Sequence, residues 1–174
     1  MRIKHLVAGI LAILPVLYAG SANAQEQAAT DTIGKSHSAF VTSTGEANWF
    51  IDMNYNGFTF QIPAGTLVER GSGFTAKYPD GSFGLSMNTV DKPMNQKYSY
   101  EVCKRLAATL KIPNPDIKKV KYGRCRGAMT SGKVEGQLVT VLVLPYDDQE
   151  ITTVIMATPN RNDWVNHYLE TLKR

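Results

Sequence analysis

Two neighbouring segments near the carboxyl end of the chain carry apolar side chains on both sides of the backbone. The first, residues 137–146, contains the run Leu-Val-Thr-Val-Leu-Val-Leu, and residues 151–157 repeat this β-branched character after a turn that starts at Pro145. A strand of this composition has to be covered on both faces. The short connection predicts antiparallel pairing at the centre of a sheet. A fold for this chain must therefore place a covering layer on each side of that pair.

Shorter segments with a two-residue hydrophobic period come earlier in the chain. In residues 57–62 this period places Phe58, Phe60 and Ile62 on one face of a strand, which indicates that one face is buried. Turns rich in glycine and proline separate it from further short strands. These are expected at residues 38–42, 66–70, 74–78, 82–90 and 118–129, and the last is expected to bulge at Gly123 and turn Cys125 inward.

Two segments change to a helical period. Val102, Leu106 and Leu110 recur every four residues and predict a helix over residues 99–110, with Ser99 as its N-cap. A closing amphipathic helix is expected over residues 162–174. Each helix has one apolar face, and the central strands need cover on both sides. The sequence therefore predicts an α/β protein of the α+β type, with a largely antiparallel sheet flanked by helices.

This order of elements resembles a known family. The motif Gly-Phe-x-Phe-x-Ile-Pro at residues 57–63, with Trp164, Tyr168 and Leu172 on the last helix, resembles the Mog1/PsbP-like group. That group includes the photosystem II extrinsic protein PsbP, the Ran-binding protein Mog1 and periplasmic DcrB-like proteins. The resemblance covers roughly residues 49–174 and implies an α/β/α sandwich, in a group whose members mostly bind or assist other proteins. It assigns a functional role to no residue of this chain.

The amino terminus has the features of a secretory signal peptide. Arg2 and Lys4 precede an apolar run over residues 6–19, and small residues follow up to Ala24, where cleavage before Gln25 is expected. The apolar run is too short to cross about 30 Å of hydrocarbon as a helix. We therefore expect a signal peptide over residues 1–24, a flexible lead-in over residues 25–47 and one domain over residues 48–174. The expected location is the periplasm or the medium, with no transmembrane segment after cleavage.

The two cysteines, Cys103 and Cys125, both lie beyond the expected cleavage point. In an oxidising compartment an isolated pair most simply forms a disulfide, which is the prediction made here. Two alternatives remain open, a pair of buried thiols and a redox pair. No Cys-x-x-Cys motif supports the redox alternative.

Lys119, Lys121, Arg124 and Arg126 belong to the densest basic run in the chain. One interpretation is an exposed edge strand that lysines protect from aggregation. The other is a patch that binds an acidic partner protein or anionic lipid headgroups. Removing residues 1–24 takes two of the 19 basic residues and leaves 17 against 15 acidic ones. A net charge near +2 gives no reason to expect nucleic acid as the partner.

Few residues suggest catalysis or metal binding. His37 falls in the expected lead-in, and His167 is expected at the boundary of the last helix rather than as a base. Asp147, Asp148 and Glu150 form the densest acidic cluster but do not match a calcium-binding loop. We therefore predict no catalytic residues, no cofactor and no metal.

The function expected from these features is that of an exported, non-catalytic binding or accessory protein of the bacterial envelope, with another protein as its partner. An immunity-type inhibitor of a secreted toxin and a generic assembly factor both fit this class. The alternatives are a small periplasmic hydrolase with an unidentified carboxylate site and a carrier of a small apolar ligand.

Overall fold

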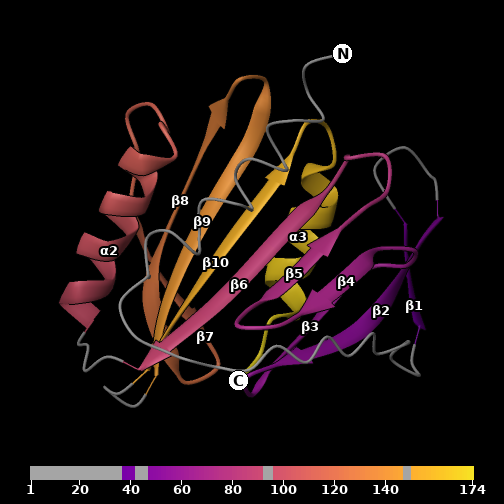
Figure 1. Cartoon of the computed structure of the whole chain (residues 1–174), viewed down its shortest axis with the longest axis horizontal. Coiled ribbons are helices and arrows are strands. Elements are labelled where there is room, and N and C mark those ends of the chain that lie inside the picture. Colours follow the sequence, from indigo (N-terminus) through magenta and orange to yellow (C-terminus); the bar gives the residue numbers. More distant parts are fainter. Residues whose placement is uncertain (1–36, 42–46, 92–95, 147–149) are drawn as a thin grey trace.

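The computed structural model describes residues 37–41, 47–91, 96–146 and 150–174, and within them the chain forms two sheets and two helices (Figure 1). The small sheet has the strand order β1-β2-β3, and the large one the order β4-β5-β6-β10-β9-β8-β7. The strands are β1 (His37–Val41), β2 (Ala47–Tyr55), β3 (Phe58–Pro63), β4 (Leu67–Arg70), β5 (Phe74–Lys77), β6 (Gly84–Asp91), β7 (Lys118–Tyr122), β8 (Cys125–Val134), β9 (Gln137–Tyr146) and β10 (Glu150–Thr158). The helices are α2 (Gln96–Thr109) and α3 (Asn162–Thr171).

The apolar pair of strands lies at the centre of the large sheet, as the sequence predicts. β9 and β10 pair antiparallel from Leu138↔Thr158 to Tyr146↔Glu150. Every pairing between neighbouring strands in both sheets is antiparallel. The predicted fold class, a largely antiparallel sheet with helices, is therefore confirmed. The resemblance to the Mog1/PsbP-like group stays a prediction.

One face of the large sheet is covered by α2. The helix packs on β8 and β9, and its apolar stripe, which includes Leu106 and Leu110, meets Val139, Val141 and Val143. These valines alternate with residues that face the other way, as strand geometry requires. The helical period noticed in the sequence therefore marks the side of α2 that contacts the sheet.

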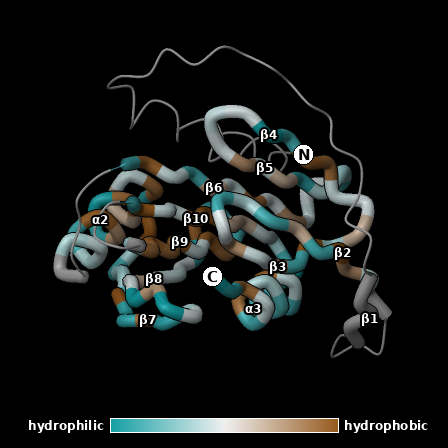
Figure 2. Tube along the Cα trace, turned by 90° about the horizontal axis from the view of Figure 1, so that it is seen from below, coloured by the Kyte–Doolittle hydropathy of each residue, from teal (hydrophilic) through white to brown (hydrophobic). Residues whose placement is uncertain are grey.

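The opposite face is covered by α3 and the small sheet together. Leu142 and Leu144 from β9 join Phe60 from β3 and Tyr168 from α3 in one cluster. Seen from below, α3 and β3 lie on the other side of the large sheet from α2 (Figure 2). The small sheet was not foreseen as a separate layer, because no signal in the sequence tells which strands pair with which. Together with α3 it supplies the cover that the central strands require on this face.

The structure corrects the long strand predicted over residues 118–129. The chain turns back at Gly123 and Arg124, so β7 and β8 form a hairpin with Tyr122 opposite Cys125. Gly123 has φ +58°, whereas Arg124 has no positive φ, and this combination fits a two-residue type II′ turn. Glycine was therefore correctly identified as a break in the strand, but it reverses the chain instead of bulging it.

Both helices differ from their predicted bounds. α2 begins at Gln96, so Ser99 lies inside the helix and is buried rather than serving as its N-cap. α3 ends at Thr171, and Lys173 then forms an antiparallel bridge with Thr59 of β3. The last residues supply hydrogen-bond partners for backbone groups at the outer edge of β3. This connects the small sheet to the end of the chain.

A strand lies within the expected lead-in, close to the strand expected at residues 38–42. β1 lies within residues 25–47 and pairs with β2 in the register His37↔Ile51 to Val41↔Ala47. The expected signal peptide lies outside the described residues. Within the described ranges, no helix combines the length and the apolar character that crossing a membrane would need.

The two cysteines of the predicted disulfide are unbonded in the structure, and the disulfide stays a prediction. Cys103 and Cys125 are both buried and are not bonded to each other. Cys103 lies in the cluster beneath α2, and Cys125 lies in the cluster on the α3 side of the sheet. A disulfide joins Cα atoms that are usually less than about 7 Å apart. Because the sheet separates the two side chains, a bridge would require rebuilding the core.

Both cysteines should resist labelling in the folded protein. Their side chains are 0% and 2% exposed, and burial raises the pKa of the Cys103 thiol to about 12, so the reactive thiolate is scarce near neutral pH. We expect a thiol reagent to label neither residue in buffer and both in denaturant without reductant, as counted by mass spectrometry. If the denatured protein reacted only after reductant was added, the result would support the predicted disulfide.

Candidate functional site

The four candidate partner-binding residues lie together at the β7 end of the large sheet. Val120 faces the core on the α3 side, so Lys119 and Lys121, its neighbours in sequence, face the other side. Arg126 of β8 is directly opposite Lys121 and joins the same face, while Arg124 occupies the turn. All four basic side chains are exposed. The spacing seen in the sequence thus becomes a cluster in space.

Lys121 and Arg126 form a pair of like charges across two strands. In a type II′ hairpin, Tyr122 and Cys125 exchange the closing hydrogen bonds, so the next pair, Lys121↔Arg126, is of the closely spaced, non-hydrogen-bonded kind. Among the described residues, no acidic side chain forms an ion pair with either cation. Like charges directly opposite each other are destabilising by a few tenths of a kcal/mol up to about 1 kcal/mol.

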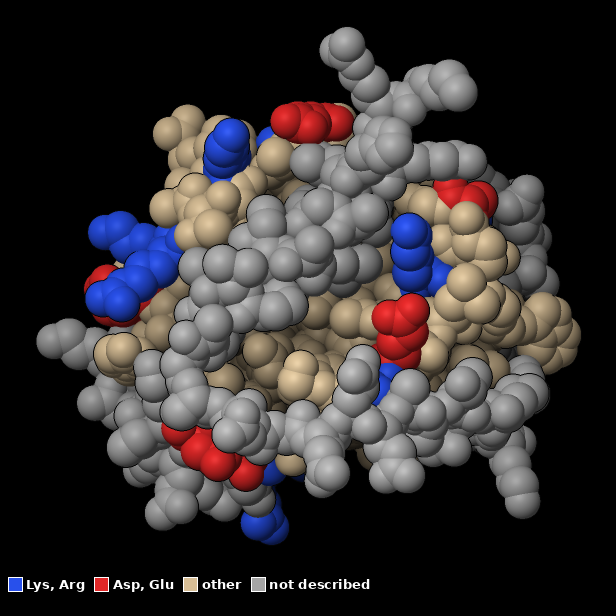
Figure 3. Space-filling model, in the orientation of Figure 1, with Lys and Arg blue, Asp and Glu red and all other residues tan. Residues whose placement is uncertain are grey.

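α2 extends this cluster. Lys104 and Arg105 are exposed on the outer surface of the helix, which packs on β8 and β9, beside the β7–β8 hairpin. Residues 101–126 hold eight basic residues and two acidic ones. α2 and β7 lie at the same end of the molecule (Figure 2), and basic side chains stand out over α2 (Figure 3). We call Lys104, Arg105, Lys119, Lys121, Arg124 and Arg126 the basic surface.

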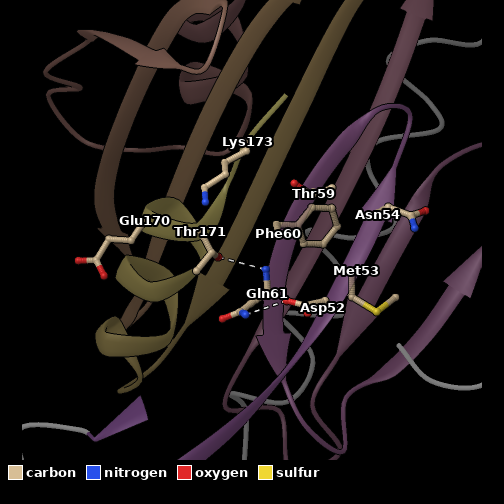
Figure 4. Close-up of a pocket in the computed structure, with 9 residues that line it drawn as sticks. All are labelled: Asp52, Met53, Asn54, Thr59, Phe60, Gln61, Glu170, Thr171 and Lys173. Atoms are coloured by element: carbon tan, nitrogen blue, oxygen red, sulfur yellow. Dashed lines mark hydrogen bonds between the residues drawn. The ribbon is translucent and has the colours of Figure 1, made fainter. Parts of the chain in front are cut away.

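An open hollow of about 550 Å³ lies between the small sheet and the end of α3 (Figure 4). Its walls come from β2, β3, α3 and the residues after α3, and they carry both signs of charge. The side chains that matter for its chemistry are Asp52, Phe60, Gln61, Glu170, Thr171 and Lys173. Sequence reasoning missed this hollow, because its residues come from segments more than 100 positions apart.

Hydrogen bonds hold one wall of the hollow in place. The Gln61 side chain donates to the Asp52 carboxylate (2.7 Å), and the Thr171 hydroxyl accepts from the Gln61 backbone N–H (3.1 Å). The Gln61 side-chain oxygen is 2.7 Å from His167 Nε2, so that nitrogen is the donor and carries a proton. This network orients polar groups at the surface, and it can bind a ligand by hydrogen bonding.

His167 is more buried than the sequence suggested. It is 9% exposed, and its ring lies 3.8 Å, centroid to centroid, from that of Phe50. Burial lowers the pKa of His167, while the nearby Glu170 carboxylate opposes the change. The packing and the bond to Gln61 give the ring a structural role beneath the hollow.

The lowered pKa of His167 predicts a loss of stability in acid. Its ordinary value is 6.5, so below this pH the unfolded chain binds a proton that the folded protein resists. The contribution to stability is complete above pH 6.5 and is lost as the pH falls through the lower folded-state pKa. We expect His167→Gln, which can keep a donor near Gln61, to flatten this part of the pH dependence in urea unfolding. An unchanged slope between about pH 7.5 and pH 5 would contradict the assignment.

Two residues of the acidic cluster, Asp147 and Asp148, lie outside the described residues. Glu150 itself binds Arg174 (3.2 Å) and accepts a hydrogen bond from Asn56 (3.3 Å). Within the described parts of the chain, no group of three or more potential metal-binding side chains comes together. The predictions of no metal, no cofactor and no catalytic residue stay predictions.

Comparisons with known proteins identify no family. No family model matches the chain, and no curated protein matches it. The solved structures include a similar chain, a Bacteroides thetaiotaomicron protein with a crystal structure at 1.50 Å resolution. The similarity has a TM-score of 0.46 at 12% sequence identity and covers 82% of this chain and 48% of the other. The present chain thus spans about half the length of that protein.

Proposed function

We propose that this chain is an exported, non-catalytic binding protein of the bacterial envelope that engages an acidic partner protein through the basic surface. The amino-terminal signal pattern supports the location. The gathering of basic residues on α2 and the β7–β8 hairpin supports the choice of partner. Carboxylates on a partner would meet cations that form few ion pairs within the described residues.

The observation that carries the proposal is the Lys121–Arg126 pair. If the strand needed only a charge to prevent aggregation, glutamate at either position would protect the edge and attract its neighbour. The chain instead retains two cations opposite each other, at a cost in stability. An unfavourable local arrangement, such as two like charges opposite each other, is found mainly where a function compensates for its cost in stability. A carboxylate supplied by a partner would remove the repulsion on binding.

The substitution Lys121→Glu separates stability from function at this pair. We expect it to raise the free energy of unfolding by roughly 0.5 kcal/mol, because repulsion by Arg126 becomes attraction. The same variant should lose cross-linking to its partner in intact bacterial envelopes, as read by gel shift and mass spectrometry. Lys133→Glu is the matched control, since Lys133 is also exposed on β8 but lies opposite Leu138. Retained cross-linking by the Lys121 variant would refute the proposed surface.

The proposed location has a separate test. Cells that express the chain are fractionated, and the amino terminus of the protein is sequenced. We expect the processed form, which begins at Gln25, in the periplasm or the medium. Accumulation of the unprocessed chain in the cytoplasm would contradict export.

A further inference from the structure

We propose that β7 binds an extended acidic segment of the partner as an added strand at the edge of the large sheet. This deepens the proposed function, on which it rests, by naming the form that the partner takes. Among the described strands, β7 is the last of the large sheet and pairs only with β8. Strand addition at such an edge supplies affinity through the backbone and specificity through alternate side chains.

The backbone groups available at this edge belong to the two lysines. Hydrogen-bonded pairs alternate along an antiparallel ladder, and the hairpin turn makes Tyr122↔Cys125 one of them. Counting back, Val120 also points its N–H and C=O groups to β8, whereas those of Lys119 and Lys121 point outward. Outside the sheet ladders, neither lysine makes a backbone hydrogen bond with another described residue. The edge can therefore accept a strand.

The side chains on the two faces of β7 define what such a strand must carry. On one face Lys119, Lys121 and Arg126 are exposed, so side chains added beside them should be carboxylates. On the other face Val120 and Tyr122 are half-buried against the core, and adjacent side chains should be apolar. Because successive side chains alternate between faces, the expected ligand alternates acidic and apolar residues.

A flat anionic membrane is the competing occupant, because it would also attract the basic surface. It would not use the outward N–H and C=O groups of Lys119 and Lys121, nor the apolar face beside Val120. The observations therefore favour an extended polypeptide over lipid headgroups.

The test uses a short, end-blocked peptide of alternating glutamate and valine, with binding to the purified full chain measured by fluorescence anisotropy. Two further peptides carry N-methyl groups on alternate residues, one on the glutamates and one on the valines, so that one of the two is blocked along the edge that pairs with β7. N-methylation removes the donors and keeps every charge. We expect at least a tenfold loss of affinity for one of the two N-methylated peptides, and a similar loss for the Lys119→Glu/Lys121→Glu variant with the unmodified peptide. The Lys77→Glu/Lys133→Glu variant, which changes the same charge at exposed positions elsewhere, should bind normally.

Three outcomes would overturn strand addition. Equal binding of the unmodified and both N-methylated peptides would mean that charge alone is recognised, and the proposed acidic partner would survive. Binding to vesicles of anionic lipid without binding to the peptide would assign the surface to a membrane and would remove the proposed partner as well. Binding to neither probe would reject the edge as a peptide site, and the cross-linking of the Lys121→Glu variant would decide separately whether the basic surface functions.

Discussion

Replacing Tyr168 by alanine is expected to lower the free energy of unfolding by about 3–5 kcal/mol, the range for deleting a large buried aromatic side chain. Tyr168 of α3 is fully buried. Its ring lies 5.1 Å, centroid to centroid, from that of Phe60 on β3, and its hydroxyl is 3.3 Å from the Met87 sulfur on β6. One side chain thus joins the closing helix to both sheets, so its loss opens a cavity where three elements meet.

The matched variant Tyr168→Phe keeps the ring and removes only the hydroxyl. Because a thioether sulfur is a weak acceptor, we expect this change to cost about 0.5 kcal/mol or less. Urea unfolding followed by circular dichroism measures both variants. A phenylalanine variant as unstable as the alanine variant would show that the polar contact, rather than packing between the layers, holds α3 in place.

Gly127→Ala is expected to cost roughly 3 kcal/mol, near the upper end for overpacking a tight site. A methyl carbon at Gly127 would collide with the backbone carbonyl oxygen of Val143 and stand 3.0 Å from the carbonyl carbon. Gly127 lies opposite Val120 in the hairpin, one residue before the β8–β9 ladder begins at Ala128. The obstacle is backbone, so it cannot move aside as the end of a flexible side chain can.

Gly71→Ala provides the control for the glycine prediction. Beyond its two chain neighbours, no described residue has an atom within 4 Å of a methyl group placed there, and Gly71 has no positive φ. We expect this substitution to change the free energy of unfolding, measured in urea, by no more than about 0.5 kcal/mol. If both alanine variants were equally stable, the close approach of β8 and β9 at Gly127 would not constrain the sheet.

The sequence predicted those parts of the fold that depend on local periodicity. Alternation placed Phe58, Phe60 and Ile62 on one face, and all three are buried. The apolar run at residues 137–146 became β9, with its neighbour β10 paired antiparallel. These predictions succeed because the side chains that face the core recur at the period of the strand or helix. That spacing can be seen in consecutive residues.

The sequence predicted the candidate site only in part. Lys119, Lys121, Arg124 and Arg126 stood out as a dense run, and the expected exposure of the two lysines is confirmed. The repulsive pairing of Lys121 with Arg126 was missed, because a strand with a bulge was expected where the chain forms a hairpin. Lys104 and Arg105 were not linked to this surface, although their exposed positions on the helical wheel were a usable signal.

The sequence by itself determined which faces of the strands and helices are apolar, because that depends on the spacing of neighbouring residues. Only the tertiary structure decided which faces meet. It placed Cys103 and Cys125 in separate clusters on the two sides of the sheet, and it brought Gln61 within hydrogen-bond distance of His167 across 106 positions. Contacts of this kind depend on strand order and on the path of the chain between layers, and no local period in the sequence encodes either.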